Sequence, residues 1–120
     1  MLRDGKMLKM VIVVNDDVEM SCGKMAVQVA HASVDCAFKL YKKSPVLFKK
    51  WIRDGQKKVV LKADEQEIFK IEGKAKSMGI LFSIIKDAGL TELEPGTLTA
   101  ISLIGEENEI DKITGYLPLK

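Results

Sequence analysis

Four short apolar runs alternate with longer segments of helical pattern along this chain, and they constrain its fold more than any other feature. Continuous runs rich in β-branched residues are typical of strands that are buried on both faces. Because helical segments separate most of the runs, the order predicts an α/β protein, a three-layer α/β/α sandwich with a four-stranded sheet. A loop alone joins the last two runs, which predicts a mixed sheet. The runs are KMVIVVN (9–15), KKVVLKA (57–63), ILFSIIKD (80–87) and LTAISLIG (98–105).

Helix start and stop signals flank the segments between the runs. Ser44 followed by Pro45 is typical of an N-cap and a first helical position, and Gly55 is a stop signal. Asp64 stands at the start of a capping pattern, and Gly79 follows the last apolar position of that segment. The helices that we expect cover about 23–43, 45–54, 64–78 and 106–114, and the tail YLPLK is a candidate terminal strand.

Length and composition favour one soluble globular domain over residues 1–120. The chain is 47% hydrophobic and 30% charged, and no apolar run approaches the roughly 20 residues that span a membrane. Its first residues, MLRDGKMLK, contain no hydrophobic signal segment. The two cysteines, Cys22 and Cys36, form no CxxC pair, and with a single histidine they exclude a closed zinc site. We therefore expect a cytoplasmic protein with reduced thiols, no metal and no membrane contact.

Positive charge is concentrated between residues 39 and 62, where nine basic residues face one acidic residue. The rest of the chain is net negative, so the two signs are separated along the sequence. Such a separation suits a polyanion that is held on one side of the protein. The simpler interpretation is a solvated, lysine-rich helix surface, with Trp51 in the core.

The first predicted helix is apolar around most of its circumference but carries a narrow polar stripe. At about 100° per residue, Gln28 lies roughly 40° from Lys24 on one side, and His31 lies roughly 20° from it on the other. Such a stripe faces a buried polar network or a cleft, because an unpaired buried lysine is very costly. Alternatively, Lys24 lies at a partly exposed edge and reaches water.

The start of the same helix suggests two further chemistries. The motif SCGKM is similar to the end of a phosphate-binding loop, but Val18 and Met25 depart from that pattern, so nucleotide hydrolysis is not expected. A thiol nucleophile at Cys22 would need His31, which lies roughly 13 Å further along the helix axis. A thiol-dependent hydrolase is therefore kept only as a minor alternative.

The segment KDAGLTELEPGTLT (86–99) is the second candidate site region. Asp87 ends an apolar strand and begins a turn rich in Gly and Pro, a position from which active-site loops often project. Thr91, Thr97 and Thr99 follow it with hydroxyl groups. Taken alone, Asp87 is better explained as a cap of the turn, and the threonines as strand formers.

Taken together and in register, these motifs resemble the type-2 (archaeal and eukaryotic) peptidyl-tRNA hydrolases. The matching segments are KMVIVVN, GKMAVQVAHA, GQKKVVLK, IKDAGLTELEPGTLTAISLIG and IDKITGYLPLK, from about Lys9 to the C-terminus. The resemblance implies an α/β/α fold, often a homodimer, and hydrolysis of the ester that joins a peptide to the terminal ribose of tRNA. It implies no metal or organic cofactor. A non-catalytic RNA- or protein-binding module on the same fold is the alternative.

The resemblance also assigns the site residues. It implies a catalytic set of Lys24, Gln28, His31, Asp87, Thr91 and Thr99, with Thr97 in the substrate-binding set. We expect Lys24 to stabilise the oxyanion or the leaving ribose oxygen while it pairs with Asp87, and Asp87 to orient the attacking water with Thr91 or Thr99. Gln28 and His31 would orient these groups or the substrate. The basic residues expected to bind tRNA phosphates are Lys49, Lys50, Arg53, Lys57 and Lys58.

Two positions depart from the pattern of the family. Glu92 stands where Gln is usual, which places a negative charge near the expected RNA site, and Asn15 stands where Arg or Thr is usual. Contacts with the end of the tRNA near Glu92 are therefore in doubt, whereas the chemistry of the site is not obviously affected.

Overall fold

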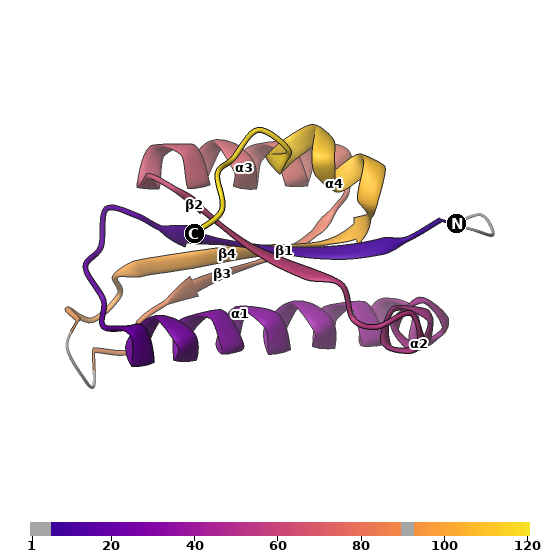
Figure 1. Cartoon of the computed structure of the whole chain (residues 1–120), viewed down its shortest axis with the longest axis horizontal. Coiled ribbons are helices and arrows are strands. Elements are labelled where there is room, and N and C mark those ends of the chain that lie inside the picture. The colour runs from indigo at the N-terminus through magenta and orange to yellow at the C-terminus, as the bar shows by residue number, and fades with distance from the viewer. Residues whose placement is uncertain (1–5, 90–92) are drawn as a thin grey trace.

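The chain folds into a four-stranded sheet that lies between two layers of helices (Figure 1). The computed structural model describes residues 6–89 and 93–120. The strands lie in the order β2-β1-β4-β3; β1 is parallel to β2 and antiparallel to β4, and β3 is antiparallel to β4. The predicted α/β/α sandwich with a mixed sheet is therefore confirmed. The strands are β1 (Leu8–Asn15), β2 (Lys58–Ala63), β3 (Leu81–Lys86) and β4 (Leu98–Glu106).

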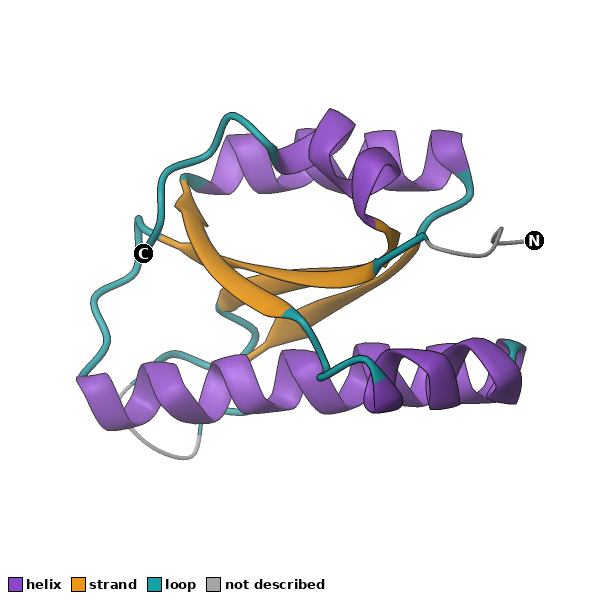
Figure 2. Cartoon of the chain, turned by 45° about the vertical axis from the view of Figure 1, so that its right-hand side comes forward, coloured by secondary structure: helices purple, strands orange, loops and turns teal. Residues whose placement is uncertain are grey.

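Two helices cover each face of the sheet, as Figure 2 shows from the side. On one face lie α1 (Cys22–Lys43) and α2 (Pro45–Arg53), and on the other lie α3 (Glu65–Met78) and α4 (Glu107–Thr114). The first three helices begin at side-chain caps, because Ser21, Ser44 and Asp64 each accept a hydrogen bond from the backbone N–H three residues later. Gly79, with φ of 67°, ends α3 in the left-handed conformation that favours glycine.

Each face of the sheet has its own apolar core. Alternate residues of β1 point to opposite faces, so Val11 and Val13 pack under α3 and α4, whereas Met10 and Ile12 pack under α1 and α2. This arrangement explains why the strand is apolar at successive positions. Trp51 of α2 belongs to the second core and is only 2% exposed, so it is a core residue rather than part of a basic surface.

The two edges of the sheet differ. The C-terminal tail covers part of the β2 edge: Leu119 bridges Leu61, and Lys120 donates its backbone N–H to the carbonyl of Val60 at 3.0 Å. The expected terminal strand is thus present as a single bridge. At the other edge, no strand within residues 6–89 and 93–120 pairs with the outer side of β3.

The strands β1, β2 and β3 run in the same direction and end where α1 begins (Figure 1). The start of α1 and the segment after β3 therefore lie at one end of the molecule, which is 44 Å long, while α2 lies at the other end. Ligands of α/β proteins commonly bind outside the carboxyl ends of the strands. None of the helices described is both long and apolar enough to cross a membrane.

Candidate active site

Lys24 and Asp87 form a buried ion pair at the end of the sheet. The Nζ of Lys24, in the first turn of α1, lies 2.5 Å from Oδ1 of Asp87, and the two side chains are 10% and 4% exposed. A cation at a helix N-terminus is disfavoured by the helix dipole, so the carboxylate is the group that stabilises Lys24 there. Two residues of the polar stripe of α1, Lys24 and Gln28, thus face a buried network, as one of the two interpretations of the sequence required, whereas the third, His31, is exposed.

Asp87 is held on both carboxylate oxygens and through its backbone. Gln28 donates its side-chain N–H to Oδ1 at 3.3 Å, and the backbone N–H of Gly89 donates to Oδ2 at 2.7 Å. The backbone N–H of Asp87 donates to the carbonyl of Thr97 at 2.8 Å. The hydrogen bond from Lys24 holds the pKa of Asp87 below its ordinary value of 3.8, while burial acts in the opposite direction. Asp87 is therefore a carboxylate at neutral pH, with a fixed orientation.

Thr99 and Gln28 extend this network into the core. The Thr99 hydroxyl lies 2.6 Å from Oε1 of Gln28 and 3.2 Å from the carbonyl of Ile85, and it has one proton to donate. Both side chains are buried. When the hydroxyl donates to Oε1, the amide of Gln28 must turn its N–H group toward Asp87. Thr99 thus acts on Asp87 through Gln28 and does not face the solvent.

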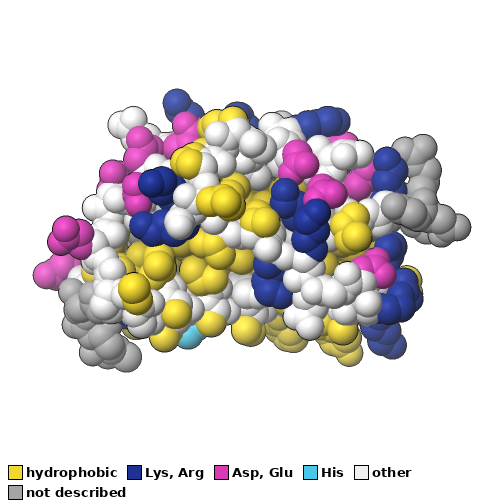
Figure 3. All heavy atoms as spheres, in the orientation of Figure 1, with side chains coloured by type: hydrophobic (Ala, Val, Ile, Leu, Met, Phe, Trp, Pro, Cys, Tyr) yellow, Lys and Arg dark blue, Asp and Glu magenta, His cyan; other side chains and the backbone are white. Residues whose placement is uncertain are grey.

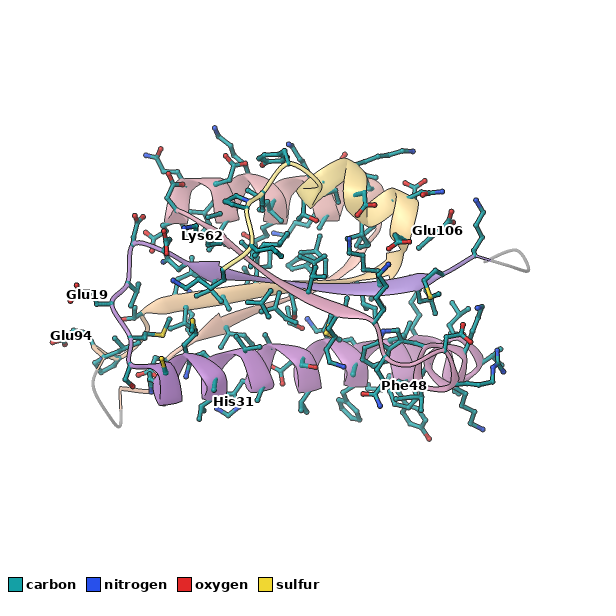
Figure 4. All side chains as sticks on the ribbon, viewed as in Figure 1. Glu19, His31, Phe48, Lys62, Glu94 and Glu106 are labelled. Carbon is teal, nitrogen blue, oxygen red and sulfur yellow. The ribbon has the colours of Figure 1, made fainter. Side chains whose placement is uncertain are left out.

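The ion pair opens into a hollow of about 270 Å³ between α1 and the segment after β3. His31 is exposed and lies on the outer side of α1, away from the sheet (Figure 4). The positive charge of a protonated His31 contributes to the lowered pKa of Asp87, although less than Lys24 does. The lining residues of the hollow are Lys24, Val27, Gln28, His31, Lys86, Asp87 and Ala88.

The other threonines of the second motif do not reach this hollow or cannot be described. The Thr97 hydroxyl donates to the carbonyl of Glu94 at 2.7 Å and so stabilises the turn, while its own carbonyl accepts from Asp87. Thr91 and Glu92 lie outside the described residues.

The sequence patterns did not single out Gly89 or Pro95, and both shape the site. Gly89 has φ of 79°, and a Cβ atom at this position would lie 2.5 Å from Cγ of Pro95. Only glycine fits this close approach, and it is the approach that points the Gly89 N–H at Asp87. The signal in the sequence was a glycine two residues after the aspartate, with a Pro-Gly pair further along the same turn.

The predicted tRNA-binding residues lie far from the ion pair. They belong to α2 and to the start of β2, and Figure 4 shows Phe48 of α2 at the opposite end of the molecule from Glu94 in the turn after Asp87. Lys50 pairs with Asp54 at 2.6 Å, and Lys57 pairs with Glu107. Lys49 and Arg53 are exposed on α2, and Nζ of Lys58 lies 4.8 Å from the centre of the Trp51 ring.

The two thiols have different surroundings. Cys22 is exposed and lines other hollows, one of them shared with Val14, Met25 and Lys120. Burial raises the pKa of the Cys36 thiol to about 11, so this cysteine is an inert core residue. In the part of the chain that the structure describes, no group of three or more His, Cys, Asp or Glu residues could hold a metal ion.

An ammonium group and an oriented carboxylate at the edge of a hollow can stabilise an oxyanion and position a water molecule. The α/β/α fold thus carries groups of the kind that ester hydrolysis needs. The family model described as "Peptidyl-tRNA hydrolase PTH2" matches residues 8–120. The chain belongs to this family.

Curated relatives agree with this assignment, and a solved structure shares the fold. A peptidyl-tRNA hydrolase of Thermococcus sibiricus is 50% identical over 113 residues, which cover 92% of this chain and 96% of the relative. Those of Methanocaldococcus jannaschii and Staphylothermus marinus are 48% and 49% identical and cover 93% and 99% of this chain, and 99% of each relative. A solved structure of a protein of unknown function from Agrobacterium tumefaciens, 14% identical, superposes with a TM-score of 0.59 over 94% of this chain and 97% of its own, and supports the fold alone.

Proposed function

We propose that this protein hydrolyses the ester bond of peptidyl-tRNA in the hollow between α1 and the segment after β3. Membership of the family gives the reaction, which releases a free peptide and a free tRNA. The observation that supports this position is the buried pair of Lys24 and Asp87 beside that hollow. In the reaction, a water oxygen bonds to the ester carbonyl carbon, the bond from that carbon to the ribose oxygen breaks, and the ribose oxygen takes a proton.

Asp87 orients the attacking water in this proposal. A carboxylate whose pKa lies below 3.8 is a weak base, so it accepts a hydrogen bond from the water rather than removing a proton from it in advance. Because Gln28 and Gly89 fix the two carboxylate oxygens, the water is held in one direction. Thr91, one of the residues implied by the resemblance, would act as a further hydrogen-bonding group on this water.

Lys24 stabilises the negative charge that develops during the reaction. Its ammonium group donates to the carbonyl oxygen as that atom becomes an oxyanion, or to the ribose oxygen as it leaves. Gln28 and Thr99 keep the pair in position, and His31 at the rim of the hollow orients groups of the substrate. Thr97 contributes by holding the turn that carries Asp87.

The basic end of the molecule is the proposed binding surface for tRNA phosphates. Lys49 and Arg53 are exposed, Arg53 with Asp54 only 3.7 Å from its Nε, and Arg53, Lys50 and Lys57 would each exchange a carboxylate partner for a phosphate. A substrate bound at both ends would extend along the length of the protein, and its affinity would fall as salt rises. The protein would act in the cytoplasm, where translation supplies peptidyl-tRNA.

The outward face of α1 is the proposed interface of a homodimer. Val27, Val34, Phe38 and Tyr41 are exposed at helical spacing along this face, and Figure 3 shows hydrophobic side chains along the lower edge of the molecule, where α1 lies. His31 lies between Val27 and Val34 on this face and the ammonium group of Lys42 lies 5.2 Å from the centre of the Phe38 ring, but the face is otherwise apolar, and packing of two copies would cover it. Val34→Glu should convert a dimer into a monomer in light scattering, and an unchanged mass would exclude this interface.

Single substitutions of the ion pair test the proposed site. Lys24→Ala and Asp87→Asn should each lower the turnover of N-acetylaminoacyl-tRNA by roughly 100-fold or more, because each removes a group that acts in the transition state. Lys70→Ala, at an exposed lysine of α3, is the matched control. Near-normal turnover in both folded variants would place the reaction elsewhere. The thiol alternative instead predicts loss of activity in Cys22→Ser, and a pure binding module predicts no hydrolysis by the wild type.

A further inference from the structure

Within residues 6–89 and 93–120, no backbone group pairs with the outer edge of β3 at Ile84 and Lys86, next to the proposed site. The backbone of Asp87 faces β4, because its N–H donates to Thr97 and its carbonyl accepts from Gly96, each at 2.8 Å. In an antiparallel pair, successive residues of a strand turn their N–H and C=O groups alternately toward and away from the partner. The register shift between Ile85 and Lys86 leaves its extra residue, Thr99, on β4, so the alternation continues along β3 itself, and Ile84 and Lys86 turn these groups outward, away from the sheet.

A side-chain contact at the other end of β3 supports this alternation. Nζ of Lys39 donates to the carbonyl of Phe82 at 2.6 Å from outside the sheet, and Phe82 has the same parity as Ile84 and Lys86. Lys39 thus bonds to the outward carbonyl of Phe82. It does not cover the edge at Ile84 and Lys86, which lies next to the hollow. The opposite edge, on β2, has no comparable opening over Val60 to Lys62, because the tail pairs with it there.

We propose that the peptide of the substrate binds as an added strand along the outer edge of β3, at Ile84 and Lys86. The inference rests on the proposed function, which places the ester at Asp87, one residue beyond the end of β3. Lys86 lines the hollow and is exposed, so a chain that leaves the hollow passes this edge first. The C-terminus of the peptide lies at Asp87, and β3 runs toward Asp87, so the two strands are parallel.

Pairing through the backbone suits a substrate whose peptide has no fixed sequence. Main-chain N–H and C=O groups are the same for every residue except proline, so an added strand is recognised without side-chain selection. The pairing ends at Phe82, whose carbonyl is already bonded to Lys39. The edge therefore holds about four peptide residues at a strand rise of about 3.3 Å.

Methylation of single peptide nitrogens tests this proposal on the unaltered protein. In a parallel pair, only alternate amides of the peptide donate to β3, so the effect must repeat with a period of two. The substrates are tRNAs that carry N-acetyl-tetra-alanine with one N-methyl group at each position in turn. We expect kcat/KM to fall roughly two- to tenfold at every second position and little at the others, the range for one hydrogen bond. A profile that is flat, or that only decays with distance from the ester, would overturn the added strand.

A proline on the edge gives a second, independent measurement. Ile84→Pro removes one outward N–H, and edge strands tolerate proline where the N–H faces outward. The measured quantity is the ratio of kcat/KM for N-acetyl-tetra-alanyl-tRNA to that for N-acetyl-alanyl-tRNA, which is too short to reach Ile84. The ratio should exceed one in the wild type and fall toward one in the variant. An unchanged ratio, including an equal loss on both substrates, would mean that the edge serves tRNA or the fold, and would overturn the proposal.

The outcome is distinguishable from a failure of the proposed site. If Asp87→Asn retains normal turnover on both substrates, the site itself is misplaced. If Asp87→Asn is inactive and the N-methyl profile of the wild type is flat, the site stands and only the added strand fails.

Discussion

The two ends of the molecule carry charge in opposite ways. At the α2 end, several lysines and an arginine lie on the surface. Where they have an acidic partner, as Lys50 and Arg53 have Asp54, water screens the charges of the pair. At the other end, one lysine and one aspartate are nearly buried together, and three further groups, on Gln28, Gly89 and Thr99, hold them in place. In our proposal, the dense surface charge binds the polyanion and the single buried pair carries the chemistry.

Substitution of Gly89, in the turn after β3, should have the largest effect on kcat among the variants that test this comparison. Gly89→Ala introduces a Cβ into Pro95 and a side chain at φ of 79°, so the turn must move and Oδ2 of Asp87 loses its N–H donor. We expect a loss of kcat of roughly 100-fold, the effect of displacing one oriented group in an active site.

Gly96→Ala is the matched control for that variant. Gly96 also has a positive φ, 81°, but a Cβ there would meet nothing within 4 Å. Both variants carry the same backbone strain, of about 1–2 kcal/mol, and only Gly89→Ala displaces the aspartate. Equal losses of kcat in the two variants would mean that strain of the turn, rather than the position of Asp87, is what matters.

Removal of the Thr99 hydroxyl should have a smaller effect. Thr99→Val keeps the shape of the side chain but leaves Oε1 of buried Gln28 without its donor, which should cost about 1–3 kcal/mol of unfolding free energy. Because Gln28 is then free to turn, kcat should fall roughly tenfold, a modest share of what a positioned group contributes. Thr99→Ser retains the hydroxyl and should restore both values in chemical denaturation and in the turnover assay. Full activity in Thr99→Val would remove Thr99 from the positioning network.

At the basic end, substitutions should change binding and leave chemistry intact. Lys49→Glu with Arg53→Glu should raise KM several-fold with little change in kcat, and should reduce the slope of log(1/KM) against log salt by about one unit per lost phosphate contact. Glu substitutions of the exposed lysines Lys70 and Lys74 on α3 make the same change of charge on the other face. If the α3 substitutions raise KM as much as the α2 substitutions do, the tRNA-binding surface is not at α2.

The smallest expected effect is on the pH dependence of the unfolding free energy, to which Asp87 contributes. The native pKa of Asp87 is lowered, so its contribution is fully present above the unfolded value of 3.8 and is lost as the pH falls through the lower native value. The difference in unfolding free energy between wild type and Asp87→Asn should therefore be constant from pH 7 to about 4 and shrink below that. Comparison of urea unfolding at several pH values measures it. A difference that changes between pH 5 and 7 would show that another group is coupled to the pair.

Much of the fold was predictable because its signals are local. Ser44 with Pro45, and Asp64 with Gly79, mark helix ends within a few residues, and the apolar run of β1 reports burial on both faces. The site was harder to predict from the sequence, because Lys24 and Asp87 are far apart along the chain and only the resemblance to the family paired them. The close approach of Gly89 to Pro95 could not be predicted, because it depends on the path of a turn. Nor could the carboxylate partner of Lys57, which comes from α4, whereas Lys50 and Asp54 form a local i,i+4 pair.

The central claim is that Lys24 and Asp87 act as one unit, and a double-mutant cycle on turnover tests it most directly. Single-turnover hydrolysis of N-acetylalanyl-tRNA would be measured for wild type, Lys24→Ala, Asp87→Asn and the double variant, each at saturating enzyme. If the pair is one unit, the double variant hydrolyses the ester about as fast as the slower single variant. If the two losses multiply in the double variant, the two groups act independently and the account is contradicted.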